Sequence, residues 1–320
     1  MILFSAKSSA VHDMHLDAVA EYAADNELTV SVRVYGLAAA LAVVKSSDRV
    51  MFSQSTGLAS LIVLPLARIR RKTIIHYMHE PTALRQKLQE NPIIKSLVWH
   101  AVQWIEMRCA SRVLVSRKAL LDQAAGVYRV ARDKISLAPL LMPRITKPHN
   151  ARSKPRITYL GRIDERRFFQ EFLQVSSDLQ QRGFRPTVLT GDPNGFRRLA
   201  PETPPSIELF AEPNFSEALK SQILSETIAL WNPKRGSIAQ SGVTADAVRY
   251  GVAVLLTDKD PAYGTLLEKG IALDFEKAAN TAFECLGSIN EAEVSAEAAS
   301  LFSIEHGRAA FEEAYFPLLA

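Results

Sequence analysis

Small and polar residues fill the loop that separates two apolar stretches of this 320-residue chain. The pattern predicts a strand that ends at Trp231 and a helix that begins near Ser241 and Gly242, with Val243 in its first turn. The unpaired N–H groups and partial positive charge of a helix N-terminus can hold a diphosphate. We therefore expect the Ser241 hydroxyl and the backbone around Gly242 to contact such a group.

Asp246 comes about one turn into the same predicted helix. Its carboxylate has the chemistry to accept hydrogen bonds from a ribose or sugar diol. An acidic residue early in a helix is also explained by complementarity with the helix dipole, so this alternative stays open.

Arginines and glycines follow two other predicted strands. The segment TYLGRIDERRF places Gly161, Arg162 and Arg167 after the strand 156–160, and LTGDPNG places Gly191 after the next strand. Arginine forms paired hydrogen bonds with phosphate oxygens and can offset the charge that builds on a departing diphosphate. The sequence predicts phosphate contacts at Arg162 and Arg167 and a close backbone approach at the glycines.

Histidines follow two predicted strands in the first half of the sequence. The sequence HYMHEP carries His76, His79 and Glu80, and His12 and His15 follow the first strand together with Asp13. A zinc site would need a third or fourth ligand at a recognisable spacing, and none is present, so we expect no metal. A hydrogen-bonding pocket residue at His79 is favoured, and surface polar groups on loops are the alternative.

Short β-branched runs alternate with longer amphipathic segments throughout, which indicates parallel sheets covered by helices. The helix after Pro92 carries one apolar stripe that we expect to lie in the core, formed by Ile94, Leu97, Val98, Ala101 and Ile105. The expected strands lie near residues 1–5, 28–35, 49–53, 73–78, 112–116, 134–138, 156–160, 186–190, 206–210, 228–231, 252–257 and 271–275.

A proline-containing polar segment, residues 146–155, has the composition of an interdomain linker. We expect an N-terminal domain at 1–148 and a C-terminal domain at 149–320, with a helix at about 306–320 packing back onto the first. The longest apolar run has 11 residues, too few to cross a bilayer, and the N-terminus does not have the pattern of a signal peptide. Two widely separated cysteines fit a reducing cytoplasm.

Charge is distributed unevenly between the halves. Residues 1–150 contain 20 Lys and Arg against 11 Asp and Glu, whereas residues 151–320 contain 18 against 23. A basic half suggests an anionic partner, and the densest cluster is Arg68, Arg70, Arg71 and Lys72, directly after the apolar segment 57–67. We predict electrostatic attachment to an anionic membrane that salt reverses. The alternative is a solvated basic loop.

Taken in order, these segments resemble the family 4 glycosyltransferases of the GT-B fold. The resemblance rests on YMHEP with the later CASRVLVSRKALLD, on YLGRIDERR, and on SGVTADAVRYGVAVLLTD. It implies two tandem Rossmann-like domains that face each other across a cleft. Arg162 matches the family's phosphate-binding arginine, Arg167 stands where lysine is usual, Asp246 matches the ribose-binding acid, and His79 is similar to a histidine near the transferred sugar.

Three positions depart from that family pattern. In the family's glutamate-seven-glutamate motif, Ile238 stands at the first glutamate and the shorter Asp246 stands at the second. Phe168 stands where a glycine follows the usual lysine. The first domain also has Lys7, Ser8 and Ser9 in place of a Gly-Gly loop.

The resemblance implies a metal-independent, retaining hexosyltransferase that moves a sugar from a nucleotide diphosphate sugar to a hydroxyl of a glycan or lipid-linked acceptor. It implies no cofactor and no nucleic-acid partner. It also implies a role in cell-surface polysaccharide or glycolipid synthesis and a cytoplasmic location. If the basic cluster attaches to a membrane, we expect the enzyme at the inner face of the plasma membrane. Two rivals remain open. One is a nucleotide-sugar 2-epimerase of the same fold, and the other is an inactive scaffold subunit.

Overall fold

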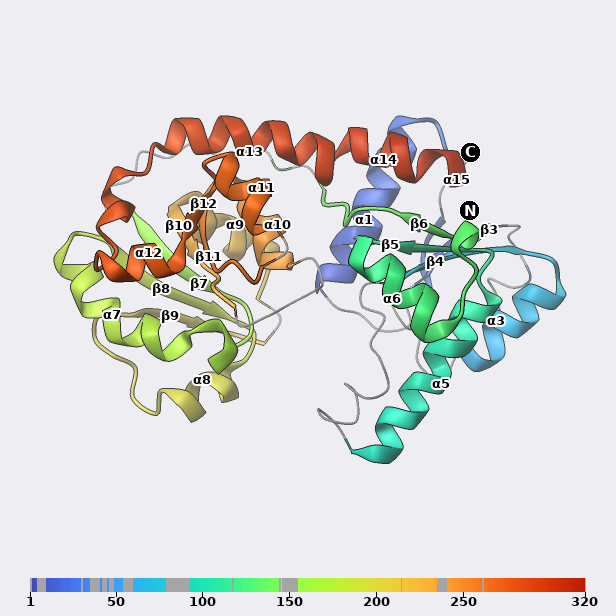
Figure 1. Ribbon diagram of the computed structural model, residues 1–320, viewed down its shortest axis with the longest axis horizontal. Coiled ribbons are helices and arrows are strands. Elements are labelled where there is room, and N and C mark those ends of the chain that lie inside the picture. The colour runs from blue at the N-terminus through green and yellow to red at the C-terminus, as the bar shows by residue number, and fades with distance from the viewer. Residues whose placement is uncertain are drawn as a thin grey trace. The chain divides into compact units, whose positions relative to one another are not determined.

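The computed structural model describes residues 2–4, 10–29, 31–34, 41, 45, 49–53, 60–78, 92–116, 118–143, 145, 155–213, 215–234, 241–260 and 262–319. The chain divides into two compact units, which Figure 1 shows with their elements labelled. Unit 1 is Met1–Pro143 with Ser303–Ala320, and unit 2 is Arg144–Phe302. The division precedes the expected boundary at 148/149, since Ile145 already packs against the core of unit 2.

Unit 1 is built on a six-stranded parallel sheet with the order β2-β1-β3-β4-β5-β6. The described side chains of β3, β4 and β5 are mostly buried and apolar, as expected for a parallel sheet with helices on both faces. The strands are β1 (Ile2–Phe4), β2 (Ser31–Val34), β3 (Arg49–Ser53), β4 (Thr73–Tyr77), β5 (Arg112–Val115) and β6 (Ile135–Leu137). The helices that precede unit 2 are α1 (Ala10–Asp25), α3 (Ser60–Ile69), α5 (Ile93–Cys109) and α6 (Lys118–Tyr128).

The C-terminal helices α14 (Arg308–Ala314) and α15 (Phe316–Leu319) belong to unit 1. The Tyr315 hydroxyl donates a hydrogen bond to the carbonyl of Pro139 at 2.7 Å, and the Met142 N–H donates to the carbonyl of His306 at 3.0 Å. Residues 303–320 therefore complete the core of unit 1, although unit 2 precedes them in the sequence.

Unit 2 has a second six-stranded parallel sheet, with the order β12-β11-β10-β7-β8-β9. Trp231 lies at the centre of its aromatic core, with ring centroids 5.2 Å from both Phe172 and Phe275. The strands are β7 (Arg156–Leu160), β8 (Arg185–Thr190), β9 (Glu208–Ala211), β10 (Thr227–Trp231), β11 (Ala253–Leu256) and β12 (Ala272–Asp274). The helices are α7 (Phe169–Gln181), α8 (Pro193–Leu199), α9 (Glu217–Ser225), α10 (Gly242–Tyr250), α11 (Tyr263–Glu268), α12 (Phe275–Asn280) and α13 (Glu291–Glu305).

Every expected strand is present, and all of the observed pairs are parallel, so the predicted α/β fold with two tandem parallel sheets is confirmed. None of the helices within the described residues combines the length and the apolar character needed to cross a membrane.

The prediction that the α5 stripe lies in the core is wrong. Ile94 is 79% exposed, Leu97, Val98 and Ala101 are also exposed, and Ile105 is half-buried. The helix turns its other side inward, where Met107 packs into a core cluster and the Glu106 carboxylate lies 3.8 Å from the His76 ring. Apolar residues occupy both sides of α5, so their spacing does not show which side meets the sheet.

Candidate functional site

The strand order of unit 2 identifies one place for a ligand. From β7 the chain continues outward through β8 and β9, and it then returns to form β10 on the other side of β7. In open parallel sheets, ligands bind outside the carboxyl ends of the strands at the point where the order reverses. Gly161 and Asn232 are the first residues after β7 and β10, so they mark this point in unit 2.

Gly161 adopts a backbone conformation that other residues rarely take. Its φ is +99°, and its N–H donates to the carbonyl of Leu189 at 2.9 Å. A Cβ atom at this position would lie 3.1 Å from Nη1 of Arg167 and 3.7 Å from the Val243 side chain. The positive φ therefore favours glycine for the turn, and a Cβ atom would also crowd the guanidinium of Arg167.

Arg167 links the loop after β7 to the end of β10. Its Nη2 donates to the Leu160 carbonyl at 2.9 Å and to Oδ1 of Asn232 at 2.7 Å, and its Nη1 donates to the Arg162 carbonyl at 3.2 Å. The guanidinium also lies over the Tyr159 ring, 5.2 Å from its centroid. Burial lowers the pKa of Arg167.

Part of the hydrogen-bonding capacity of Arg167 is unused within the described residues. A guanidinium carries five N–H groups, and three of them make the bonds above. Nε is buried and has no partner among the described residues. Arg167 therefore positions the loop and keeps donors that an anion could use.

Asn232 is a site residue that sequence reasoning missed. Its side chain is fully buried, accepts from Arg167, and donates through Nδ2 to Oγ1 of Thr244 at 3.0 Å and to Oγ of Ser241 at 3.4 Å. One amide thus joins the loop after β7 to the N-terminus of α10. The available signal was a lone amide directly after the buried strand that ends at Trp231.

Helix α10 begins at Gly242, as expected, and Ser241 caps it, because its side chain accepts from the N–H of Thr244. Helix geometry leaves the N–H groups of Gly242 and Val243 without intrahelical acceptors. The Val243 side chain would lie 3.7 Å from a Cβ atom at Gly161, so the start of α10 lies beside the loop after β7. The structure therefore unites five predicted site residues with Asn232: Gly161, Arg167, Ser241, Gly242 and Val243.

The remaining predicted residues are placed differently. Arg162 has an exposed side chain on the same loop, and only its backbone carbonyl is used by Arg167 and by the Tyr159 hydroxyl. Gly191 is exposed after β8, the strand that pairs with β7. His79 lies outside the described residues.

Asp246 is held in a buried charge cluster. It is 6% exposed, its Oδ1 lies 3.1 Å from Nζ of Lys220, and it lies 4.0 Å from Arg249. Glu217 contacts both cations. Burial raises the pKa of Asp246 although Lys220 and Arg249 act to lower it. These contacts hold α9 against α10, so the structure gives Asp246 a structural role, and ribose binding stays a prediction.

Two histidines of unit 1 lie in its interior. His15 is fully buried and accepts from the N–H of Leu141 at 3.1 Å through Nδ1. His76 is fully buried within β4, and burial lowers its pKa to about 4. Within the described part of the chain, no group of three or more His, Cys, Asp or Glu side chains has the geometry to hold a metal ion.

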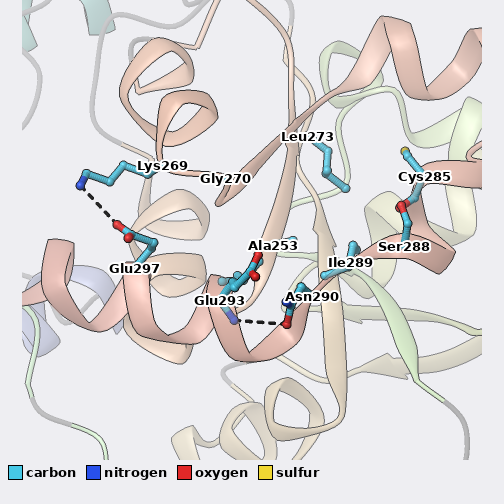
Figure 2. Close-up of a pocket in the computed structure, with 11 residues that line it drawn as sticks. Ala253, Lys269, Gly270, Leu273, Cys285, Ser288, Ile289, Asn290, Glu293 and Glu297 are labelled. Atoms are coloured by element: carbon cyan, nitrogen blue, oxygen red, sulfur yellow. Dashed lines mark hydrogen bonds and ion pairs between the residues drawn. The ribbon is translucent and has the colours of Figure 1, made fainter.

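A cavity of about 390 Å³ lies elsewhere in unit 2. Figure 2 shows it between α13 and the strands β11 and β12, with an ion pair of 3.2 Å between Lys269 and Glu297 at one side. Ala253 begins β11 and Gly270 precedes β12, so these lining residues lie at the amino ends of the strands. The cavity is therefore at the amino ends of the strands, opposite to the carboxyl ends where Gly161 and Asn232 lie.

Glycosyltransferases of known structure have a similar fold. One from Rickettsia africae ESF-5 aligns with a TM-score of 0.67 and 13% identity over 97% of this chain and 94% of that chain. WaaG, a glycosyltransferase involved in lipopolysaccharide biosynthesis, aligns with a TM-score of 0.64 and 12% identity over 98% and 99%. Anabaena Alr3699/HepE, solved with UDP and with UDP-glucose, aligns with a TM-score of 0.62 and 14% identity over 96% of each chain.

At these identities the likeness establishes the fold, which is that of GT-B glycosyltransferases with two Rossmann-like domains. No protein-family profile matches the chain, and no curated protein matches its sequence.

Proposed function

We propose that the chain is a family 4 glycosyltransferase that moves a sugar from a nucleotide diphosphate sugar to an acceptor hydroxyl. The observation that carries the proposal is the arrangement at the reversal point of the second sheet. Gly161, the guanidinium of Arg167 and the N-terminus of α10 lie together there, held by the buried amide of Asn232. This is a cationic and donor-rich site with the chemistry to bind a diphosphate.

In this proposal the residues have distinct roles. Arg162, whose side chain is exposed, contacts the diphosphate directly, and the N–H groups of Gly242 and Val243 donate to it. Arg167 fixes the loop through three hydrogen bonds and supplies its remaining donors. Fixed donors stabilise the charge that develops on the leaving nucleotide diphosphate without reorganising during the reaction. The transfer is thus proposed to be metal-independent.

The donor is proposed to be a UDP-sugar. The support is the fold shared with HepE, which was solved with UDP and UDP-glucose. The acceptor is proposed to be a glycan or lipid-linked hydroxyl, and the anomeric configuration is proposed to be retained, both on the resemblance of YLGRIDERR and SGVTADAVRYG to family 4 enzymes.

The first test is binding of UDP, GDP, ADP and TDP sugars by thermal shift. A ligand that binds only the native state raises the apparent stability by about 2.7 kcal/mol at 100 times its Kd. We expect UDP and UDP-sugars to raise Tm, and EDTA to leave the shift unchanged. A failure of every nucleotide to shift Tm would overturn the donor assignment.

A matched pair of variants then tests the site itself. Arg162→Ala is expected to lower transfer at least ~10²-fold, the scale for losing one fixed group that stabilises transition-state charge. Arg166→Ala is the control, because Arg166 is a neighbouring exposed arginine that pairs with Asp164 at 2.9 Å. Equal activity of the two variants would remove Arg162 from the mechanism. Epimerisation of UDP-sugar without acceptor would replace transfer with the epimerase reaction.

A further inference from the structure

Exposed apolar side chains are concentrated on two helices of unit 1. Among the described residues, twelve large hydrophobic side chains are exposed, and nine of them belong to α3 and α5. The two helices pack against each other, and Figure 1 labels both. The nine are Ile62, Leu66, Ile69, Ile93, Ile94, Leu97, Val98, Trp99 and Trp104. All of them except Trp99, which shares a side of α5 with the buried Ser96 and Val102, form what we call the α3–α5 apolar face.

The outward side of α5 is apolar, whereas a helix that faces water usually has polar residues on that side. Ile94, Leu97, Ala101 and Trp104 follow one another at intervals of three or four residues, Val98 lies four residues after Ile94, and all five are exposed. Residues at these intervals lie on one side of a helix. The acidic residue of α5 is buried on the other side, against the sheet. The side that faces outward is therefore suited to an apolar surrounding.

The charges on the same elements have one sign. Residues 60–72 and 92–109 contain six Lys and Arg and one acid, the buried Glu106. The cations are Arg68, Arg70, Arg71, Lys72, Lys95 and Arg108. An interface between two copies of this face would place the cations of both copies near one another with no exposed acid on these elements to pair with them, which is unfavourable. An anionic surface with an apolar interior complements both the charge and the apolar side chains.

We propose that the α3–α5 apolar face docks on an anionic phospholipid bilayer, with the helices lying in the plane of the interface. Helix α5 has 17 residues, and no described helix is suited to span a membrane, so the contact is with one leaflet. Trp104 has the amphipathic ring that favours the headgroup level, and the Arg108 guanidinium lies 5.2 Å from the centroid of this ring. Long basic side chains can reach the headgroups while their stems stay on apolar surface.

This mode of attachment extends the prediction made from the basic cluster alone. Charge attraction weakens as salt shortens the Debye length from ~10 Å at 0.1 M to ~3 Å at 1 M. Burial of apolar side chains in the interface persists in salt. We therefore expect part of the protein to remain on vesicles in 1 M NaCl, contrary to purely electrostatic attachment.

The test is flotation of the purified full chain with vesicles of phosphatidylcholine, with and without phosphatidylglycerol. Wild type is expected to float with the anionic vesicles and to stay partly bound in 1 M NaCl. A triple variant with Ile94→Ser, Leu97→Ser and Val98→Ser is expected to bind at least ~10-fold more weakly at low salt and to be released completely by 1 M NaCl. Each substituted side chain is exposed, so the fold is retained. Ile304→Ser is the matched control, because Ile304 is 63% exposed outside this face.

Tryptophan emission supplies an independent readout. The chain has three tryptophans, of which Trp104 lies on the α3–α5 apolar face, Trp99 is exposed on another side of α5, and Trp231 is fully buried in unit 2. Anionic vesicles are expected to shift the emission of wild type to shorter wavelength. Phosphatidylcholine vesicles alone are expected to produce a weaker shift.

Three outcomes would overturn the proposal. They are no flotation of wild type at low salt, equal flotation of wild type and the triple variant in both salt conditions, or a dimer in solution that the triple variant dissociates. The last would assign the face to a second copy of the chain. None of these measurements requires a donor or transfer, so they are independent of the proposed enzymatic function.

Discussion

Replacing Asn232 by alanine tests whether one buried amide holds the candidate site together. The change removes the acceptor for Nη2 of Arg167, at 2.7 Å, and the donor to Oγ1 of Thr244, at 3.0 Å. A hydrogen bond to a charged group contributes about 1.5–3 kcal/mol and a neutral one about 0.5–1.5 kcal/mol. The free energy of unfolding of unit 2 should therefore fall by ~2–4 kcal/mol.

The expected effect on ligand binding is separate from this loss of stability. Without Asn232, neither Arg167 nor the N-terminus of α10 is fixed relative to the other, so the Kd for UDP should rise at least ~10-fold, or about 1.4 kcal/mol. Calorimetric titration with UDP gives the Kd, and urea unfolding gives the stability. Both are measured on the purified full chain below the unfolding transition.

A buried hydrogen bond elsewhere in unit 2 provides the control. Oγ of Ser176 lies 2.7 Å from Oγ of Ser206 and donates to the Leu173 carbonyl, away from the reversal point of the sheet. Ser176→Ala should lower stability without changing the Kd for UDP. If Asn232→Ala binds UDP as tightly as Ser176→Ala does, the amide does not organise the site and the reasoning is refuted.

Three further predictions concern stability. Gly161→Ala should unfold at a lower urea concentration than the matched Gly183→Ala. Both positions have positive φ, of +99° and +89°, but only at Gly161 would a Cβ atom meet Arg167, at 3.1 Å. Equal losses of stability in the two variants would contradict this. His76 has its pKa lowered from 6.5 to about 4 by burial, so the unfolded chain binds more protons between these values and stability should fall by about 3 kcal/mol as pH drops through that window. His76→Gln should lack this contribution in Tm measured against pH, and an identical slope in both proteins would count against it. Asp246→Asn should lower the free energy of unfolding by about 3 kcal/mol because it breaks a buried ion pair; unchanged stability with a raised donor KM would instead indicate ribose binding.

The fold was predictable because the strands of a parallel sheet are buried on both faces and therefore have mostly apolar sequences. The strands Arg156–Leu160 and Ala253–Leu256 are buried at every position, and the second of them, AVLL, therefore appears as a short continuous apolar stretch. The start of α10 was predictable for a local reason, since Ser241 is a favoured capping residue before a short amphipathic segment.

Features that depend on tertiary contacts were not predictable from local patterns. Asn232 is fully buried, and its role depends on Arg167, which is 65 residues away in the sequence. The outward side of α5 was assigned to the core because its spacing is helical and apolar, although Glu106 on the other side meets His76 from β4. Spacing reports which residues share a side, but the neighbours of that side are set by the rest of the fold.

The return of residues 303–320 to unit 1 affects the order in which the chain can mature during synthesis. The hydrogen bonds from Tyr315 to Pro139 and from Met142 to His306 join parts of unit 1 that are separated by all of unit 2. Unit 2 is continuous in sequence and can assemble as it leaves the ribosome, since domains generally fold as units during translation. Unit 1 cannot complete the core that α1 covers until residues 303–320 have been synthesised. The unit that is synthesised first therefore completes its fold last.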